Sequence, residues 1–191
     1  MAAKSNLKNM VLCLFGTCLV CSALLGGVYA LTKGPIDRTN AQLLRASIGA
    51  VLPEGGDLSE AKPVEVGGLP SEYYVLTDGD QVKAYAVKST ATGFGGPIQL
   101  MVGITADGVI YNTSVLSHSE TPGLGAKCTT DKNFMEQWKG FNPSVKILKV
   151  KKENGDVDAI TASTITSRAY TLAVENAVKA YQSLSSKTSQ N

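Results

Sequence analysis

Five hydroxyl side chains occupy seven consecutive positions in the stretch "TASTITS" at residues 161–167, between the acidic "GDVDAI" and the helical pattern "RAYTLAVENAVKAY". Ser and Thr are favoured at helix N-termini because a side-chain oxygen accepts from the unpaired N–H groups of the first turn. The same N–H groups, with the positive end of the helix dipole, also hold a phosphate, either free or esterified to one of the hydroxyls. The cluster therefore predicts a helix cap or a phosphate site, and the heptapeptide alone is consistent with both.

Iron–sulfur clusters held by cysteines and metal sites built from several histidines are excluded by the small number of these two residue types. The chain has one histidine, His118, and four cysteines, three of which lie in an apolar N-terminal run. The fourth, Cys128, can form neither a disulfide within the following domain nor a Cys-ligated iron–sulfur cluster by itself. A site built from several histidines, including a haem site of that kind, is also excluded. We predict no metal site.

The N-terminal apolar run, residues 10–31, contains 22 residues without a charge and lies between Lys8 and Lys33. As a helix it would span about 33 Å, enough to cross a hydrocarbon core of ~30 Å. A cleavable signal peptide is the alternative, because "VYA" at 28–30 offers small residues for cleavage. A retained anchor is favoured, since a signal peptide's apolar region is usually ~7–15 residues. A short basic N-terminus before a large domain favours the N-terminus inside and the domain outside the membrane.

The 158 residues after Lys33, 34–191, fit one domain, which contains 15 Lys and Arg and 16 Asp and Glu. This balance gives no electrostatic basis for binding nucleic acid. We divide the chain into an N-terminal segment 1–9, a transmembrane helix 10–31, a connecting helix and linker 32–62, a domain 63–184 and a polar tail 185–191.

The predicted fold class is α+β. Helical spacing of apolar residues precedes Pro53, and the Gly- and Pro-rich residues 54–70 predict a loop. Three strand–turn–strand units with Asp-Gly or Asn-Gly turns follow, at 73–89, 97–117 and 145–161. Period-two alternation predicts that Ile98, Leu100 and Val102 share a face of the sheet. A last helix over 165–184 has one predicted packing face, made of Ile165, Ala169, Leu172, Ala173, Ala177, Ala180 and Leu184.

Two glycine-rich loops could approach a ligand. In "ETPGLG" at 120–125, Pro122 stiffens the chain while Gly123 and Gly125 permit close backbone contact. An ordinary long connection is the alternative. "TGFGGPI" at 92–98 opens a strand and lacks the G-x-x-x-x-G-K-[ST] pattern, so a nucleotide P-loop is not supported.

Three segments together, "GFGGPIQLMVGI", "SHSETPGLGAK" and "DAITASTITSRAYTLAVENAVKAY", resemble the FMN-binding domain of the G subunit of Rnf electron-transport complexes. The related C subunit of the sodium-pumping NADH:quinone oxidoreductase is also similar, although it is typically longer. In this family a flavin is bonded through its phosphate to a threonine in a D-x-x-[ST]-G-A-T motif. Asp158 matches the Asp, Thr161 the [ST] and Thr164 the acceptor. Ala162 stands where Gly is usual, and Ser163, a competing hydroxyl, where Ala is usual.

The resemblance implies a membrane-anchored electron carrier in a ferredoxin:NAD+ oxidoreductase complex, coupled to Na+ or H+ movement. The implied cofactor is FMN, held as a phosphoester of Thr164 that a separate flavin transferase installs. The implied location is the bacterial inner membrane, with the domain on the extracytoplasmic side. Arg168 is a candidate phosphate neighbour, or else a solvated first-turn arginine. The implied cofactor contacts are Glu120, Thr121, Gly123, Leu124, Gly125, Thr161, Ser163 and Ile165.

Three other functions are alternatives to this one. A C-subunit-like component of a quinone reductase, or another exported FMN carrier, would use the same site. An exported hydrolase would use His118 with Ser117 or Ser119 and Glu120, but sequence neighbours seldom form a triad and no G-x-S-x-G motif is present. A non-redox anchored scaffold would contain no flavin. The resemblance requires no catalytic acid or base, because the redox chemistry belongs to the cofactor.

Overall fold

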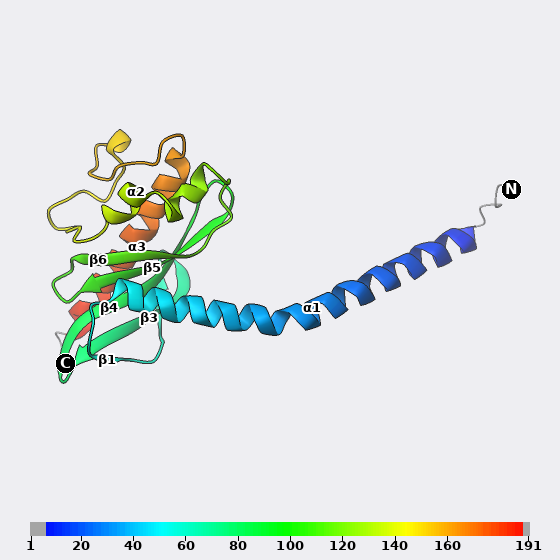
Figure 1. The fold of residues 1–191 in the computed structure, drawn as a ribbon, viewed down its shortest axis with the longest axis horizontal. Coiled ribbons are helices and arrows are strands. Elements are labelled where there is room, and N and C mark those ends of the chain that lie inside the picture. Colours follow the sequence, from blue (N-terminus) through cyan, green and yellow to red (C-terminus); the bar gives the residue numbers. More distant parts are fainter. Residues whose placement is uncertain (1–6, 189–191) are drawn as a thin grey trace. The chain divides into compact units, whose positions relative to one another are not determined.

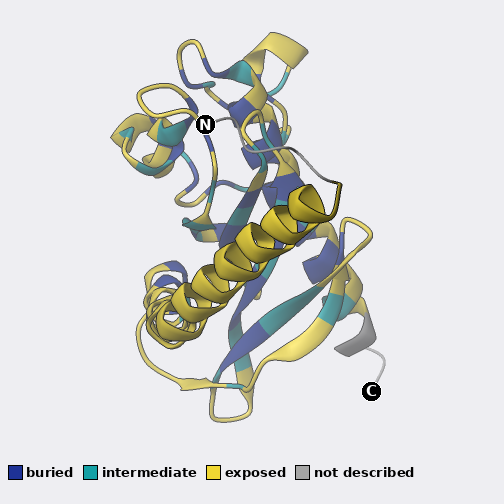
Figure 2. Cartoon of the chain, turned by 90° about the vertical axis from the view of Figure 1, so that its right-hand side faces the viewer, coloured by how far each residue is buried: buried dark blue, intermediate teal, exposed yellow. Residues whose placement is uncertain are grey.

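The computed structural model describes residues 7–188 and divides the chain into two units, residues 1–43 and 44–191. Helix α1 (Leu7–Val51) extends through the first unit and into the second, continuing past Pro35 without a break. Its most apolar 18-residue window has a mean hydropathy of 2.3, and none of that window is buried. The helix is yellow along this part in Figure 2. By length and composition it is able to cross a membrane.

The C-terminal end of α1 belongs to the folded domain. Ser47, Ile48 and Val51 are buried, and Ile48 and Val51 join Leu52 in a small core that includes Met101 of the sheet. The helix ends at Val51, two residues before Pro53, as the restriction on residues preceding proline predicts. This end of α1 therefore covers part of one sheet face.

The centre of the domain is an antiparallel sheet with the strand order β1-β3-β4-β5-β6, in which β2 also pairs with β3. The two hairpins predicted at 73–89 and 97–117 are confirmed as β3–β4 and β5–β6. Ile98, Leu100 and Val102 are fully buried in the main core, as alternation predicts. The strands are β1 (Asp57–Leu58), β2 (Lys62–Val66), β3 (Leu69–Asp78), β4 (Gln81–Thr92), β5 (Pro97–Thr105) and β6 (Ile110–Ser117).

Two predictions for the connections are wrong. Residues 54–70 contain β1 and β2, because both short segments pair with the long strand β3. Residues 145–161 form no hairpin: the described chain there has a 3-10 turn, η2 (Lys151–Glu153), and a single parallel bridge between Val150 and Val157. Asn154 adopts a left-handed φ of 58° and returns its N–H to Lys151 O at 3.2 Å. Local bonds therefore replace the ladder that an Asn-Gly hairpin would make.

Helix α3 (Thr164–Thr188) packs on the other sheet face and lies behind the strands in Figure 1. Its buried face includes Ala169, Ala173 and Ala177 as predicted, whereas Ile165 and Leu172 are about half exposed. The larger side chains of Tyr170, Val174, Val178 and Tyr181 point into the core and rotate the packing face away from the predicted one. Residues 1–6, and 189–191 of the predicted polar tail, lie outside the described residues.

Two short helices complete the domain, η1 (Gly125–Thr129) and α2 (Lys132–Glu136). The Asp131 carboxylate caps α2 by accepting from the backbone N–H groups of Asn133 and Phe134. Phe134 and Trp138 are buried beside Tyr170 of α3, while Met135 is partly exposed. The chain thus has the predicted α+β fold, and η1 and the start of α3 come together at one end of it.

Candidate functional site: a cavity at the start of helix α3

A cavity of about 360 Å³ lies where the glycine-rich loops meet the first turn of α3. Its volume falls in the range of small-molecule sites, ~300–1,000 Å³. Seven of the nine predicted cofactor contacts line it. The lining residues are Phe94, Glu120, Thr121, Leu124, Gly125, Ala162, Ser163, Thr164, Ile165 and Thr166.

The hydroxyls of residues 161–167 have two roles, since one ties the preceding segment to the helix and others lie at the cavity. Ser167 donates to Ser163 O at 2.9 Å and accepts the Ile160 N–H at 2.9 Å, so it ties the entry segment to the helix. Ser163 N–H donates to Ile160 O at 3.0 Å, closing a turn in which Ala162 has a φ of 61°. This is the position where the family motif has glycine, the residue that adopts a left-handed φ at least cost. Ser167 therefore acts as the structural hydroxyl and leaves Ser163 and Thr164 at the cavity.

Polar groups with unused bonding capacity gather at this helix end. Ser163 Oγ is buried and has no hydrogen-bond partner in the described part of the chain, which is uncommon for a buried hydroxyl. The first N–H groups of an α-helix have no partner within the helix. Thr164 Oγ1, half-buried, accepts from Lys152 Nζ at 3.4 Å. This combination can hold an anion at Thr164.

Glu120 connects three segments behind the cavity. It is only 5% exposed, and its Oε1 accepts the Gly95 N–H at 3.0 Å while its Oε2 accepts the Thr166 hydroxyl at 2.5 Å. A Cβ added at Gly125 would collide with Oε2, so that position has room only for glycine. The buried carboxylate thereby holds residues 93–96, the start of η1 and the first turn of α3 in register.

Apolar side chains surround the outer part of the cavity. Phe94, Leu124 and Ile165 are 69%, 44% and 50% exposed, and all three line it. Exposed apolar groups beside an unpaired hydroxyl and a helix N-terminus fit a ligand with an apolar body and an anionic end. Phe94 was missed as a site residue, although it lies in the glycine-rich "TGFGGPI" loop. Ala162 and Thr166 were missed as well, although both lie inside the hydroxyl cluster.

Two predicted contacts do not line the cavity. Thr161 is exposed, and Gly123 occupies a turn with a φ of 74°. Arg168, the candidate phosphate neighbour, forms an ion pair with Glu153, with Nε and Oε1 2.7 Å apart. The histidine is engaged in its own turn, because His118 Nδ1 accepts the Glu120 N–H at 3.2 Å. Within residues 7–188, no hydrogen bond joins His118 to Ser117 or Ser119, so the hydrolase arrangement is not formed.

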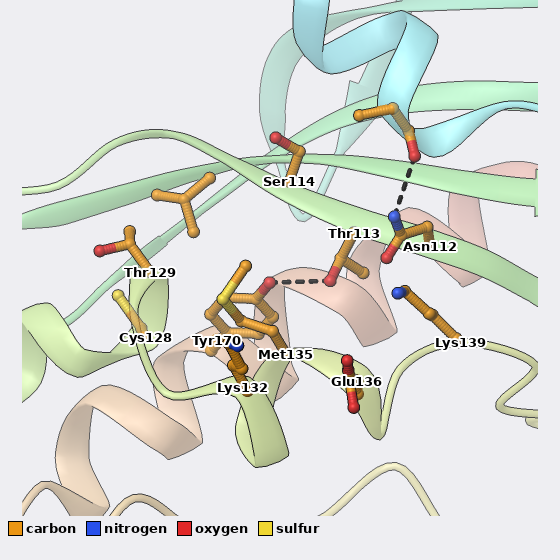
Figure 3. A pocket seen from close by; sticks show the side chains of 12 residues that line it. Asn112, Thr113, Ser114, Cys128, Thr129, Lys132, Met135, Glu136, Lys139 and Tyr170 are labelled. Atoms are coloured by element: carbon orange, nitrogen blue, oxygen red, sulfur yellow. Dashed lines mark hydrogen bonds between the residues drawn. The ribbon is translucent and has the colours of Figure 1, made fainter.

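A second cavity of about 410 Å³ lies between β6, η1, α2 and Tyr170 (Figure 3). Tyr170 and Thr113 share a hydrogen bond of 2.8 Å at its floor, and Asn112 donates to Ala50 O at 2.9 Å. Burial raises the pKa of the Cys128 thiol to about 11, so that the thiol stays protonated at neutral pH. None of the predicted cofactor contacts lines this cavity.

Comparison with known proteins identifies the family. Residues 93–179 match the model of the FMN-binding domain. The chain is 30% identical over 173 residues to the G subunit of the proton-translocating ferredoxin:NAD(+) oxidoreductase complex of Clostridium ljungdahlii, covering 90% of this chain and 88% of that protein. It is 33% identical over 168 residues to the G subunit of the Na(+)-translocating ferredoxin:NAD(+) oxidoreductase complex of Acetobacterium woodii, covering 81% of each.

A solved structure shares the fold. The NqrC crystal structure from Shewanella oneidensis aligns with a TM-score of 0.51 at 24% identity, over 64% of this chain and 62% of that one, which is less than two thirds of its length. Residues 93–179, which match the FMN-binding family model, include both glycine-rich loops, η1 and most of α3. These parts build the cavity at the start of α3. From its identity and coverage with the two relatives, the chain belongs to the family of G subunits of ion-translocating oxidoreductase complexes.

Proposed function

We propose that this chain is a membrane-anchored electron-carrying subunit of a ferredoxin:NAD+ oxidoreductase complex, with FMN bonded through its phosphate to Thr164. The observation that carries the proposal is the position of Thr164, which lies at the start of α3 on the rim of a cavity lined by exposed apolar side chains. The relatives' names supply the complex, and the FMN-binding family model supplies the cofactor.

The residues of the cavity fit FMN. The phosphate end would meet the first N–H groups of α3 and the unpaired hydroxyl of Ser163. Phe94, Leu124 and Ile165 would give apolar contact to the flavin ring, whose burial against them is favourable. When bound, FMN supplies one- and two-electron redox chemistry. The role of the chain is then to hold the cofactor and to shield it.

The attachment of FMN is a group transfer with no change in oxidation state. Thr164 Oγ1 forms a bond to the flavin phosphorus of FAD, and the bond from that phosphorus to the bridging pyrophosphate oxygen breaks. AMP leaves with the bond's electron pair, and the threonine proton is released to the transferase or solvent. The described domain only has to present the hydroxyl, so a separate flavin transferase is a required partner.

Ion coupling would be a property of the whole complex. One relative is named for proton and the other for Na+ translocation, although both are G subunits. We propose that α1 anchors the protein among the other membrane subunits and that the domain lies on the extracytoplasmic side, because the flank before the span is basic.

The test is Thr164→Ala, expressed with an active flavin transferase or purified from the native host. Covalent flavin, read as fluorescence of the band on a denaturing gel, should be lost completely, while the fold is retained at a cost of ~1 kcal/mol or less, because Thr164 is only half-buried and loses one long hydrogen bond. Ser163→Ala removes the neighbouring hydroxyl but leaves the acceptor in place, so covalent flavin should still be found on the denaturing gel.

Peptide fragmentation of the wild-type protein should map the FMN mass to Thr164. A map to Ser163, Thr161 or Thr166 would contradict the assigned acceptor. No flavinylated peptide in cells with an active transferase would contradict the electron-carrier function itself.

A further inference from the structure

We infer that Lys152 is the residue that binds and neutralises the phosphate at Thr164. This inference rests on the proposed function. Lys152 Nζ donates to Thr164 Oγ1 at 3.4 Å, from a turn that is 12 residues earlier in the chain. Nothing in the local sequence around Thr164 points to this lysine, because the contact exists only in the folded domain.

The turn that carries Lys152 is fastened on both sides of it. Lys151 Nζ lies 2.7 Å from Asp158 Oδ1, and Glu153 Oε1 lies 2.7 Å from Arg168 Nε. Three consecutive residues of η2 therefore contact three points along the segment from Asp158 to Arg168. With its two neighbours held, the ammonium of Lys152 is directed to the middle of that segment, where Thr164 lies.

The charges around Thr164 favour Lys152 over the other nearby cations. Arg168 and Lys151 each already face a carboxylate. Lys152 has no ion-pair partner in the portion of the chain that the structure describes, so its full charge is available. A phosphodiester between threonine and FMN carries one negative charge, which one ammonium balances through a charge-assisted hydrogen bond.

The contact between Lys152 and Thr164 is accessible to solvent, which limits how strongly the ammonium can stabilise the phosphate. Lys152 is exposed and Thr164 half-buried, and water screens such a contact. During attachment, negative charge on the phosphoryl oxygens would be stabilised by Lys152 together with the N–H groups of α3. Loss of the ammonium should therefore slow attachment without abolishing it.

The experiment compares Lys152→Gln with Lys152→Arg and with Lys149→Gln. Each full-length variant is incubated with flavin transferase and FAD, and the loaded fraction is followed over time by intact mass. Lys152→Gln should load ~3–10-fold more slowly, and its rate should depend less on salt concentration. Lys152→Arg should restore most of the rate.

Lys149→Gln is the matched control, because it removes the same charge from an exposed residue three positions away. It should load at the wild-type rate. A second readout is the phosphorus NMR shift of the loaded protein, which should change in Lys152→Gln and stay at the wild-type value in Lys149→Gln.

Equal loading rates for the wild type and Lys152→Gln, with an unchanged phosphorus shift, would overturn the inference and leave the proposed function in place. Equal slowing by Lys152→Gln and Lys149→Gln would also overturn it, because only general charge would then matter. Absence of flavin from the wild-type protein itself would instead mark the failure of the proposed function.

Discussion

The two cavities described above differ in whether their buried polar side chains are paired, more than in size. The cavity at the start of α3 has a volume of about 360 Å³, and the second one about 410 Å³. In the second, Tyr170 bonds to Thr113 and Asn112 to the Ala50 carbonyl. In the first, Ser163 Oγ has no partner in residues 7–188, and a helix begins there with unpaired N–H groups. A buried hydroxyl without a partner, rather than volume, distinguishes the candidate cofactor site.

Glu120→Ala should have the largest effect on the first cavity's structure. It leaves the buried Thr166 hydroxyl without its acceptor and removes the acceptor of the Gly95 N–H, so we expect a loss of ~2–4 kcal/mol in the free energy of unfolding. Urea unfolding of the domain measures it. Covalent loading should fall as well. A loss below ~0.5 kcal/mol would mean that the carboxylate does not hold the three segments together.

Cys128→Ala tests the second cavity through pH. The folded thiol has a pKa of about 11, above the ordinary value of 9.0, because burial and the nearby Glu120 charge disfavour the thiolate. The unfolded chain therefore loses its proton first, and the stability due to this group falls as the pH rises from about 9 to about 11.

The wild type should lose ~2 kcal/mol more stability over this interval than Cys128→Ala does. Unfolding curves at successive pH values give the difference. If the free energy of unfolding changed with pH in the same way in both proteins, this would contradict a buried thiol that stays protonated.

Tyr170→Phe tests whether the second cavity takes part in cofactor binding. The change removes the hydrogen bond to Thr113 and should cost ~1 kcal/mol, with covalent flavin loading unchanged. Thermal unfolding and gel fluorescence measure the two quantities on the same sample. A clear loss of flavin would show that the second cavity takes part in holding the cofactor, and the distinction between the cavities would fail.

Ala162→Gly should have the smallest effect, and it should be stabilising. Ala162 has a φ of 61°, a conformation that costs a non-glycine residue ~1–2 kcal/mol. Glycine removes this cost, but it also raises the conformational entropy of the unfolded chain, which lowers the free energy of unfolding by ~0.4–1 kcal/mol. We therefore expect a net gain of ~0.5–1 kcal/mol in urea unfolding. A loss of stability would mean that the Ala162 methyl makes packing contacts worth more than the strain.

Local sequence signals predicted the parts of the molecule whose conformation depends on neighbouring residues. The apolar run predicted the exposed segment of α1, and the Asp-Gly turns with alternating strands predicted β3–β4 and β5–β6. The Asn-Gly turn at 154–155 failed as a hairpin signal, because local bonds close it: the Asn154 N–H donates to Lys151 O, and Lys151 forms an ion pair with nearby Asp158. Asn-Gly is favourable in a hairpin turn and is also found in this 3-10 turn, so the dipeptide alone does not decide between the two.

The sequence by itself determined that a helix starts near the hydroxyl cluster, that Thr164 occupies the acceptor position of the family motif, and that the chain carries an apolar segment long enough to cross a membrane. Only the tertiary structure decided which hydroxyl ties the entry segment to the helix and which one is left unpaired. It also decided that Phe94 lines the same cavity as Thr164 and that Lys152 contacts Thr164. It also decided the packing face of α3, where Tyr170 and Val174 replaced Ile165 and Leu172. The physical reason is that helix and turn formation follow from residues a few positions apart, whereas contacts such as that of Glu120 with Thr166, 46 residues away, depend on how the sheet and helices pack.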